Sequence, residues 1–185
     1  FADCTALTAV RIPKTVAYLG SGAFSGCTAL TTATIDGGFH TLSSKTFSGC
    51  TALENVTVGI AVTNIQSQAF SGCTGLKQIK LLDTVAEIAL DAFINCPQLS
   101  ISGYRLSYAY TYARSCNIAF QALSEKAGDV NGDGSVLLTD VLEIQKYLSA
   151  VSQLTPFQLK IADYDGNDSV NTSDVLAIQR AIARL

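Results

Sequence analysis

Apolar residues recur along the first two thirds of the chain at a fixed interval of 23 residues. The pattern Phe-x-x-Cys-x-x-Leu begins at Phe1, Phe24, Phe47, Phe70 and Phe93, without a skipped period. Matches at one unbroken period lie far beyond chance, so this part of the chain is built from structural repeats.

Each repeat also predicts a short strand with one buried face, because apolar residues alternate with others just after the Leu. The inward positions are Val10 and Ile12, Ala33 and Ile35, Val56 and Val58, and Ile79 and Leu81. A second apolar pair follows in each unit: Val16 and Leu19, Phe39 and Leu42, Val62 and Ile65, and Val85 and Ile88. One unit cannot bury its own apolar side, so units must stack at about 4.8 Å per strand. The prediction is a β-solenoid of 23-residue coils.

This register bears on the six cysteines, because five of them, Cys4, Cys27, Cys50, Cys73 and Cys96, occupy one position of the repeat. They are interpreted as a buried ladder of small apolar side chains that stay free thiols. Disulfides are a weaker alternative, because stacked, parallel Cβ directions suit the bridge torsion poorly. A metal site is weaker still, because no Cys-x-x-Cys pair exists and His40 is the only imidazole.

Charge divides the chain into two parts. Residues 1–124 hold 7 basic and 6 acidic side chains, whereas residues 125–185 hold 5 basic and 9 acidic ones. We therefore predict a solenoid domain over 1–124, a linker over 125–128 and a second domain over 129–185.

The net charge of −3 argues against nucleic-acid binding. No apolar stretch approaches the roughly 18 residues of a membrane span, and the first residues carry no signal peptide.

The acidic second part contains two loops with the spacing of a 12-residue calcium site, which takes oxygen ligands at positions 1, 3, 5, 7 and 12. In the first loop Gly134 fills the turn position, and the predicted ligands are Asp129, Asn131, Asp133, the Ser135 carbonyl and Asp140. In the second, Asp168 replaces the turn glycine, and the ligands are Asp163, Asp165, Asn167, the Ser169 carbonyl, Asn171 and Asp174. The sequence thus predicts two bound Ca²⁺ ions. An apolar helix is expected after each loop, capped by Thr139 and Ser173.

Catalysis is poorly supported. A nucleophilic cysteine needs a nearby base, and the single His40 is expected in an exposed turn; a glycosidase needs paired carboxylates, which the solenoid does not offer. The outward strand positions form a mildly basic, Thr-rich strip: Ala9, Arg11, Thr32, Thr34, Asn55, Thr57, Gln78 and Lys80. A peptidase inhibitor would need a protruding reactive loop, and every repeat linker is short.

The segments Phe-Ser-Gly-Cys-Thr-Ala-Leu and Leu-Gly-Ser-Gly-Ala-Phe of residues 1 to about 124 resemble the BspA-like class of bacterial surface leucine-rich repeats. The stretch Ile101–Leu123 is similar to the unit that closes such arrays, which implies a helix over the last coil with Cys116 beneath it. The resemblance implies an extracellular solenoid that binds a protein or a glycan. Because the chain opens inside a repeat, we expect a signal peptide and earlier coils to be missing.

Residues 128–185 resemble a type I dockerin, in which two half EF-hands follow each other. The resemblance implies calcium-dependent binding to the cohesin domain of a scaffoldin in a secreted, cellulosome-type assembly, without direct membrane insertion. It places partner contacts at loop positions 10 and 11 and on the following helices: Leu138, Thr139, Val141, Leu142, Gln145 and Lys146, then Thr172, Ser173, Val175, Leu176, Gln179 and Arg180. Because Leu138 and Thr172 differ, one half is expected to dominate the contact.

The expected fold class is therefore α+β with two domains, namely a leucine-rich-repeat solenoid with a helical cap and a small all-α dockerin. The expected function is non-catalytic anchoring, in which the solenoid presents a binding surface. A surface adhesin or a peptidase inhibitor remains the alternative.

Overall fold

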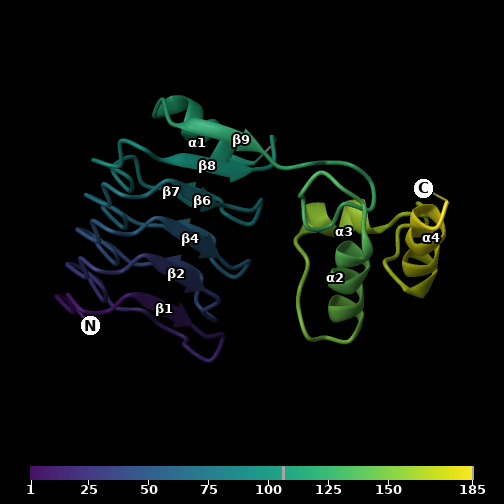
Figure 1. The fold of residues 1–185 in the computed structure, drawn as a ribbon, viewed down its shortest axis with the longest axis horizontal. Helices are drawn as coiled ribbons and strands as arrows, with labels where there is room; N and C mark the ends of the chain where they lie inside the picture. Colours follow the sequence, from purple (N-terminus) through teal and green to yellow (C-terminus); the bar gives the residue numbers. More distant parts are fainter. Residues whose placement is uncertain (106, 185) are drawn as a thin grey trace. The chain divides into compact units, whose positions relative to one another are not determined.

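The computed structural model describes residues 1–105 and 107–184. It divides into two compact units, Phe1–Ala122 and Leu123–Leu185 (Figure 1). The boundary lies two residues before the predicted end of the solenoid domain at Ser124. The Ser124 N–H donates to the Gly132 carbonyl at 3.4 Å, and the Leu123 side chain lies over Gly132, so both residues pack with the second unit.

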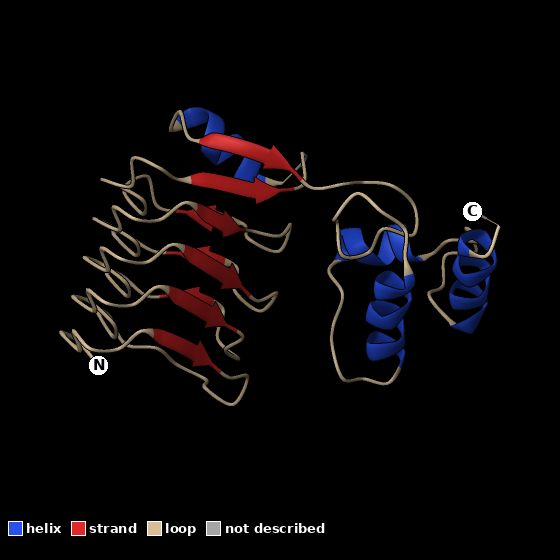
Figure 2. Ribbon diagram, in the orientation of Figure 1, coloured by secondary structure: helices blue, strands red, loops and turns tan. Residues whose placement is uncertain are grey.

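The first unit is a solenoid whose coils each contribute a strand to a parallel sheet, as the 23-residue period predicts (Figure 2). The six-stranded sheet has the order β1 (Ala9–Ile12), β2 (Thr32–Ile35), β4 (Asn55–Val58), β6 (Gln78–Lys80), β8 (Ser100–Gly103) and β9 (Ala119–Ala122). A three-stranded parallel sheet consists of β3 (Thr41–Leu42), β5 (Asn64–Ile65) and β7 (Glu87–Ile88).

Strand register follows the repeat. Val10 pairs with Ala33, which pairs with Val56, an offset of 23 residues at each step. The offset falls to 22 between β6 and β8, where Ile79 pairs with Ile101. The apolar positions face inward, with Ile35 fully buried, so the predicted solenoid is confirmed.

Two side-chain ladders run through the solenoid core. The Phe rings stack nearly parallel, with centroids 5.4 Å apart from Phe24 to Phe47 and from Phe47 to Phe70. The thiols form the second ladder, in which Cys50 Sγ donates to the Phe24 carbonyl at 3.1 Å. All six cysteines are free, in agreement with the ladder interpretation. The thiols of Cys27, Cys50, Cys73 and Cys96 each donate to the Phe carbonyl of the preceding coil, which also accepts the backbone N–H of that coil's own Cys.

The solenoid ends in α1 (Tyr108–Ser115), followed by β9, which pairs in parallel with β8. Ser107 caps α1 by accepting the Tyr110 N–H, and Tyr112 lies over Phe93 with ring centroids 6.1 Å apart. The expected capping helix is present, with the partly buried Cys116 at its C-cap against the core. The additional strand β9 was not anticipated.

The second unit contains α2 (Leu138–Leu148), α3 (Pro156–Ala162) and α4 (Thr172–Ile182). Its core includes Val130, Ile144 and Ile178, all fully buried. The segment that links the two loops forms α3, because Thr155 caps it: Thr155 Oγ1 accepts the Gln158 N–H and Gln158 Oε1 accepts the Thr155 N–H. Within the described ranges, no helix has the length and apolarity needed to cross a membrane.

Candidate calcium loops and docking surface

The first acidic loop wraps around the carboxylate of Asp129, which is fully buried. Asp129 Oδ1 accepts the N–H groups of Gly132 and Asp133 at 3.0 and 3.1 Å, and Oδ2 accepts the Gly134 N–H at 2.8 Å. An ionised oxygen strengthens each of these bonds. The loop backbone therefore folds around a fixed negative charge at position 1.

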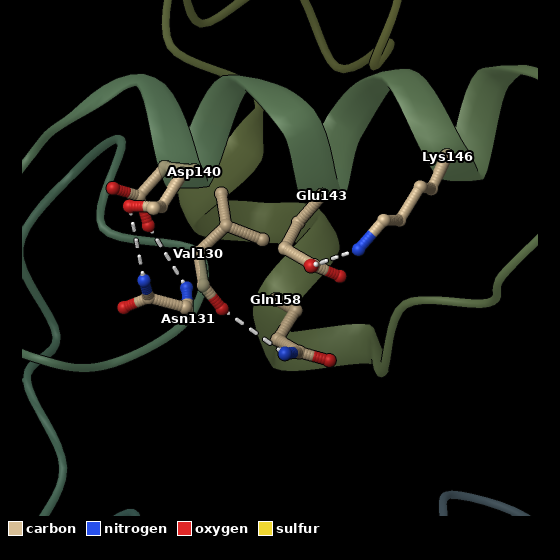
Figure 3. Close-up of polar contacts among 7 residues, drawn as sticks. Val130, Asn131, Asp140, Glu143, Lys146 and Gln158 are labelled. Carbon is tan, nitrogen blue, oxygen red and sulfur yellow. Dashed lines mark hydrogen bonds and ion pairs between the residues drawn. The ribbon is translucent and has the colours of Figure 1, made fainter.

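Asp140, at position 12, joins the loop to the helix. Its Oδ1 accepts the Asn131 N–H at 3.0 Å (Figure 3), and its Oδ2 accepts the Leu137 N–H at 2.9 Å. Because Asp140 is the third residue of α2, its charge also lies at the positive end of the helix dipole. The last loop position and the start of the helix are thus held by one side chain.

The second loop repeats this geometry around Asp163 and Asp174. Asp163 accepts the N–H groups of Gly166, Asn167 and Asp168 at 2.8–3.0 Å. Asp174 is fully buried and accepts the N–H groups of Tyr164, Asp165 and Asn171. The carboxylate oxygens of Asp163, Asp165 and Asp174 approach within 4.8 Å of one another. This loop has Asp at position 3 and Asn at position 5, whereas the first loop has Asn131 and Asp133 in those places.

The donor set fits a hard divalent cation. Asp129, Asp140 and Asp174 are fully buried, yet the ion pairs of the described residues connect other side chains: Arg11 with Asp36, Lys77 with Glu54, and Lys146 with Glu143. Buried carboxylates are costly unless a positive charge compensates them. Clustered carboxylate, amide and carbonyl oxygens are the ligands that Ca²⁺ prefers.

The turn at loop position 6 has the left-handed backbone that a calcium loop requires. Gly134 has φ of 97° and Asp168 has φ of 62°. Glycine adopts this conformation freely, whereas Asp does so at some cost. Asp168 therefore fills the expected place in the second loop with more strain than Gly134 does in the first.

Two sequence expectations need correction, both at helix starts. Thr139 and Ser173 do not cap the helices. Each is already the second helical residue, of α2 and α4 respectively. The cap of α4 is Asn171, whose Oδ1 accepts the Ser173 N–H at 2.7 Å and whose Nδ2 donates to the Ser169 carbonyl at 2.9 Å. The Asn171 oxygen thus caps α4, and its role as a calcium ligand, directly or through water, stays a prediction.

The two loops are linked through their flanking segments. Gln158 Nε2, from α3, donates to the Val130 carbonyl of the first loop at 3.0 Å (Figure 3). The Gly128 N–H donates to the Ile161 carbonyl of α3 at 2.8 Å. Sequence reasoning missed this role of Gln158, although the pattern Thr155-x-x-Gln158 before an apolar run is a capping-box signal. Order in one loop therefore supports order in the other.

Most of the predicted cohesin contacts lie on the surface of α2 and α4. Leu138 is 64% exposed, Leu142 49% and Leu176 45%. Exposed polar side chains accompany them: Thr139, Gln145, Thr172, Ser173, Gln179 and Arg180, with Lys146 part-buried in its ion pair with Glu143.

Two predicted contacts are wrong. Val141 and Val175 are 3% and 8% exposed and pack in the core of the unit, because their helical phase matches that of the buried Ile144 and Ile178. Sequence reasoning also missed Leu137, which precedes α2 and is 48% exposed. The apolar surface is thus larger beside the first loop than beside the second.

Two family models match the chain. The BspA-type leucine-rich repeat region matches residues 1–106 in six copies, and the type I dockerin domain matches residues 127–183. Both families are interaction domains, and no enzymatic domain was detected. A comparison with curated proteins finds no significant match.

Two solved structures are similar to the chain. A leucine-rich cell surface protein from Faecalibacterium prausnitzii A2-165 is 31% identical over 57% of this chain and 28% of its own, with a TM-score of 0.53. A leucine-rich repeat protein from Bacteroides ovatus ATCC 8483 is 22% identical over 67% of this chain and 38% of its own, with a TM-score of 0.48. The present chain thus spans well under half the length of either protein.

Proposed function

Since the chain belongs to the BspA-type leucine-rich-repeat family and carries a type I dockerin domain, we propose that it is a non-catalytic, extracellular adaptor. The dockerin domain binds calcium and a cohesin domain. In the proposed function it anchors the chain to a scaffold in this way, while the solenoid presents a surface for a protein or glycan ligand. The observation that carries the proposal is the pair of loops whose buried carboxylates, Asp129, Asp140 and Asp174, lack a cationic side-chain partner among the described residues.

Each loop is proposed to hold one Ca²⁺, which neutralises the clustered carboxylates when bound. The side chains at positions 1, 3, 5 and 12 provide the oxygens: Asp129, Asn131, Asp133 and Asp140 in the first loop, and Asp163, Asp165, Asn167 and Asp174 in the second. The carbonyls of Ser135 and Ser169 add position 7. Asp140 and Asp174 also accept backbone N–H groups at the starts of α2 and α4. Binding of the ion therefore also orders the helices that carry the docking surface.

The α2 half is proposed to dominate the cohesin contact. Leu137, Leu138 and Leu142 form an apolar patch on this half, whereas the equivalent positions on α4 are Asn171, Thr172 and Leu176. Well-packed apolar anchors account for most of the binding energy of such interfaces. Two different halves therefore favour one orientation over the other.

The first experiment separates anchoring from the other possible roles. Immobilised full-length chain is presented to a panel of type I cohesins with Ca²⁺ and with EDTA, and bound cohesin is measured by surface plasmon resonance. Capture that requires Ca²⁺ supports the proposal, since metal binding and folding are coupled in small calcium modules. Equal capture in EDTA, with unchanged helicity by circular dichroism, would contradict it.

A residue exchange between the halves tests which half dominates. Leu138→Thr gives the first half the residue of the second, and Thr172→Leu is the matched reverse change. We expect Leu138→Thr to weaken binding by about tenfold, because an exposed anchor is lost, and Thr172→Leu to leave binding unchanged or stronger. Equal losses in the two variants would show that neither half dominates.

A further inference from the structure

A groove lies between the turn of the fifth coil and the end of α1, with a volume of about 720 Å³. It is lined on one side by Leu90, Phe93, Ile94 and Asn95, and on the other by Tyr112 and Cys116, among others. Its size is within the roughly 300–1,000 Å³ of pockets that enclose small ligands. All of these residues belong to the solenoid unit.

The preceding coils show what such a turn normally contacts. Two N–H groups on each turn donate to two carbonyls of the next coil: Phe47 to Ala69 and Gly49 to Ser71, both at 2.8 Å. The same pair recurs one coil later, from Phe70 to Ala92 at 2.8 Å and from Gly72 to Ile94 at 2.9 Å. Each turn therefore recognises two carbonyls that lie two residues apart in the chain above it.

In the fifth coil these two donors belong to Phe93 and Asn95. Among the hydrogen bonds of the described residues, neither N–H has a protein acceptor. The turn itself keeps the geometry of the others: the Phe93 ring stacks on Phe70 with centroids 5.1 Å apart, and Asn95 has φ of 61° where Gly72 has 71°. Both residues line the groove, Phe93 being 5% exposed, and the turn that carries their N–H groups keeps the conformation of the inner coils.

The sequence of this last turn changes in a second, independent way. One row of the solenoid is Ser21, Ser44 and Ser67 and then becomes Leu90; another is Ser25, Ser48 and Ser71 and then becomes Ile94. Leu90 is 81% exposed and Ile94 is 49% exposed, so α1 does not cover them. Apart from Ala2 on the first coil, these two rows hold hydroxyls until the fifth coil, where the large apolar side chains of Leu90 and Ile94 replace them and stay accessible.

The groove is also nearly uncharged. Its one acidic lining residue, Asp91, already accepts the Ser67 hydroxyl at 2.8 Å through Oδ2. A neutral occupant with apolar side chains suits this lining better than a charged polymer or a phosphate.

We propose that this groove binds a peptide segment of a partner protein, with the Phe93 and Asn95 N–H groups donating to two peptide carbonyls two residues apart. In the inner coils the two accepting carbonyls, such as those of Ala69 and Ser71, lie two residues apart in a turn, so the peptide must present two of its carbonyls with this spacing. Leu90 and Ile94 cover apolar side chains of the peptide. Backbone bonds supply affinity and the apolar contacts select the sequence, as when a peptide adds to a sheet edge. The proposal specifies the solenoid's ligand and so rests on the ligand-binding role proposed for the solenoid.

The test uses the full chain labelled with ¹⁵N and a capped synthetic peptide with the sequence of residues 46–53, in which Ser replaces Cys50. This segment is one that sits on a preceding turn in the solenoid itself. We expect the amide resonances of Phe93 and Asn95 to shift and saturate, and their hydrogen exchange to slow by at least about tenfold at saturation. Absence of shifts up to millimolar peptide, or shifts confined to other residues, would overturn the proposal.

The double variant Leu90→Ser, Ile94→Ser tests the groove wall. It restores the residues of the inner coils, so the fold should persist, and we expect the peptide Kd to rise by about tenfold. Tyr18→Ser is the matched control, because Tyr18 is an apolar side chain that is 77% exposed on the first coil, away from the groove. Equal affinity of the two variants would exclude the role of Leu90 and Ile94.

Two further readouts separate the alternatives. A concentration-dependent dimer in sedimentation that the double variant abolishes would assign the groove to a second copy of the chain and overturn the peptide proposal. Cohesin capture on the same samples should be unaffected by the peptide and by the groove variants. Loss of peptide binding with intact capture therefore rejects only the groove, whereas loss of capture would count against the anchoring function.

Discussion

Asp129→Asn is the sharpest test of the calcium loops, because it removes one charge and one acceptor without changing the size of the side chain. Asp129 is fully buried and accepts three backbone N–H groups, two at Oδ1 and one at Oδ2. An amide retains a single oxygen, so at least one N–H faces an NH₂ group instead of an acceptor. Hydrogen bonds to charged groups contribute about 1.5–3 kcal/mol each.

The loss of one such bond and the weakening of two others add up to about 3 kcal/mol, which corresponds to about a 100-fold loss of calcium affinity in the first loop. Isothermal titration of the decalcified chain with Ca²⁺ measures this loss, and we expect two transitions in the wild type and one in the variant. Circular dichroism at each calcium concentration shows whether helix formation follows the ion.

The chain provides a matched control for this variant. The exchange Asn131→Asp with Asp133→Asn gives the first loop the order of the second loop and keeps its charge unchanged. We expect this exchange to change the affinity by less than about threefold, because oxygen number and charge are conserved. If Asp129→Asn also bound within about threefold of the wild type, or if the exchange were equally damaging, the assignment of Asp129 as the central ligand would be refuted.

Three further outcomes follow from the structure. Phe47→Ala should lower the free energy of unfolding of the solenoid by about 3–5 kcal/mol in urea titrations, because Phe47 is fully buried between two stacked rings; a cost below about 1 kcal/mol would contradict the ladder. Burial raises the pKa of the Cys50 thiol to about 12, so it should resist a disulfide reagent at pH 8 until the chain unfolds, with labelled peptides identified by mass spectrometry. Because the folded pKa is the higher one, this contribution to stability should fall as pH rises from about 9 towards 12, and a rise in stability would oppose it. Asp168→Gly should stabilise the second loop by about 1 kcal/mol in thermal unfolding with Ca²⁺, since it relieves a left-handed Asp; Gly134→Asp is the reverse control and should destabilise the first loop.

Most of the fold could be predicted from two features of the sequence, the 23-residue repeat and the spacing of the acidic loops. A 23-residue period forces equivalent residues to lie above one another, so Cys27, Cys50 and Cys73 could be identified as one buried row. The two acidic loops were equally recognisable, because their predicted calcium ligands are spaced along a single short segment. Both signals are local or strictly periodic, and such patterns survive without knowledge of the tertiary contacts.

Other features depended on how elements pack. Val141 and Val175 look like their exposed neighbours in a helical sequence, and only the phase of α2 and α4 against each other buries them. The cap of α4 fell on Asn171 rather than Ser173, because the position of the first helical turn depends on the loop that precedes it. The strand β9 is short, and its pairing with β8 follows from where α1 returns the chain.

By itself, therefore, the sequence determined the solenoid, its thiol and Phe ladders, and the two acidic loops. Each of these features follows from a regular spacing of residues along the chain. The tertiary structure decided which side chains remain accessible. Leu90 and Ile94 occupy rows that hold Ser in the inner coils, and the structure shows that they lie exposed on the turn of Phe93 and Asn95, whose N–H groups have no protein acceptor among the described residues. That difference has one physical reason: burial of a repeat's upper face depends on whether another coil covers it, and this is a property of the stack rather than of the unit.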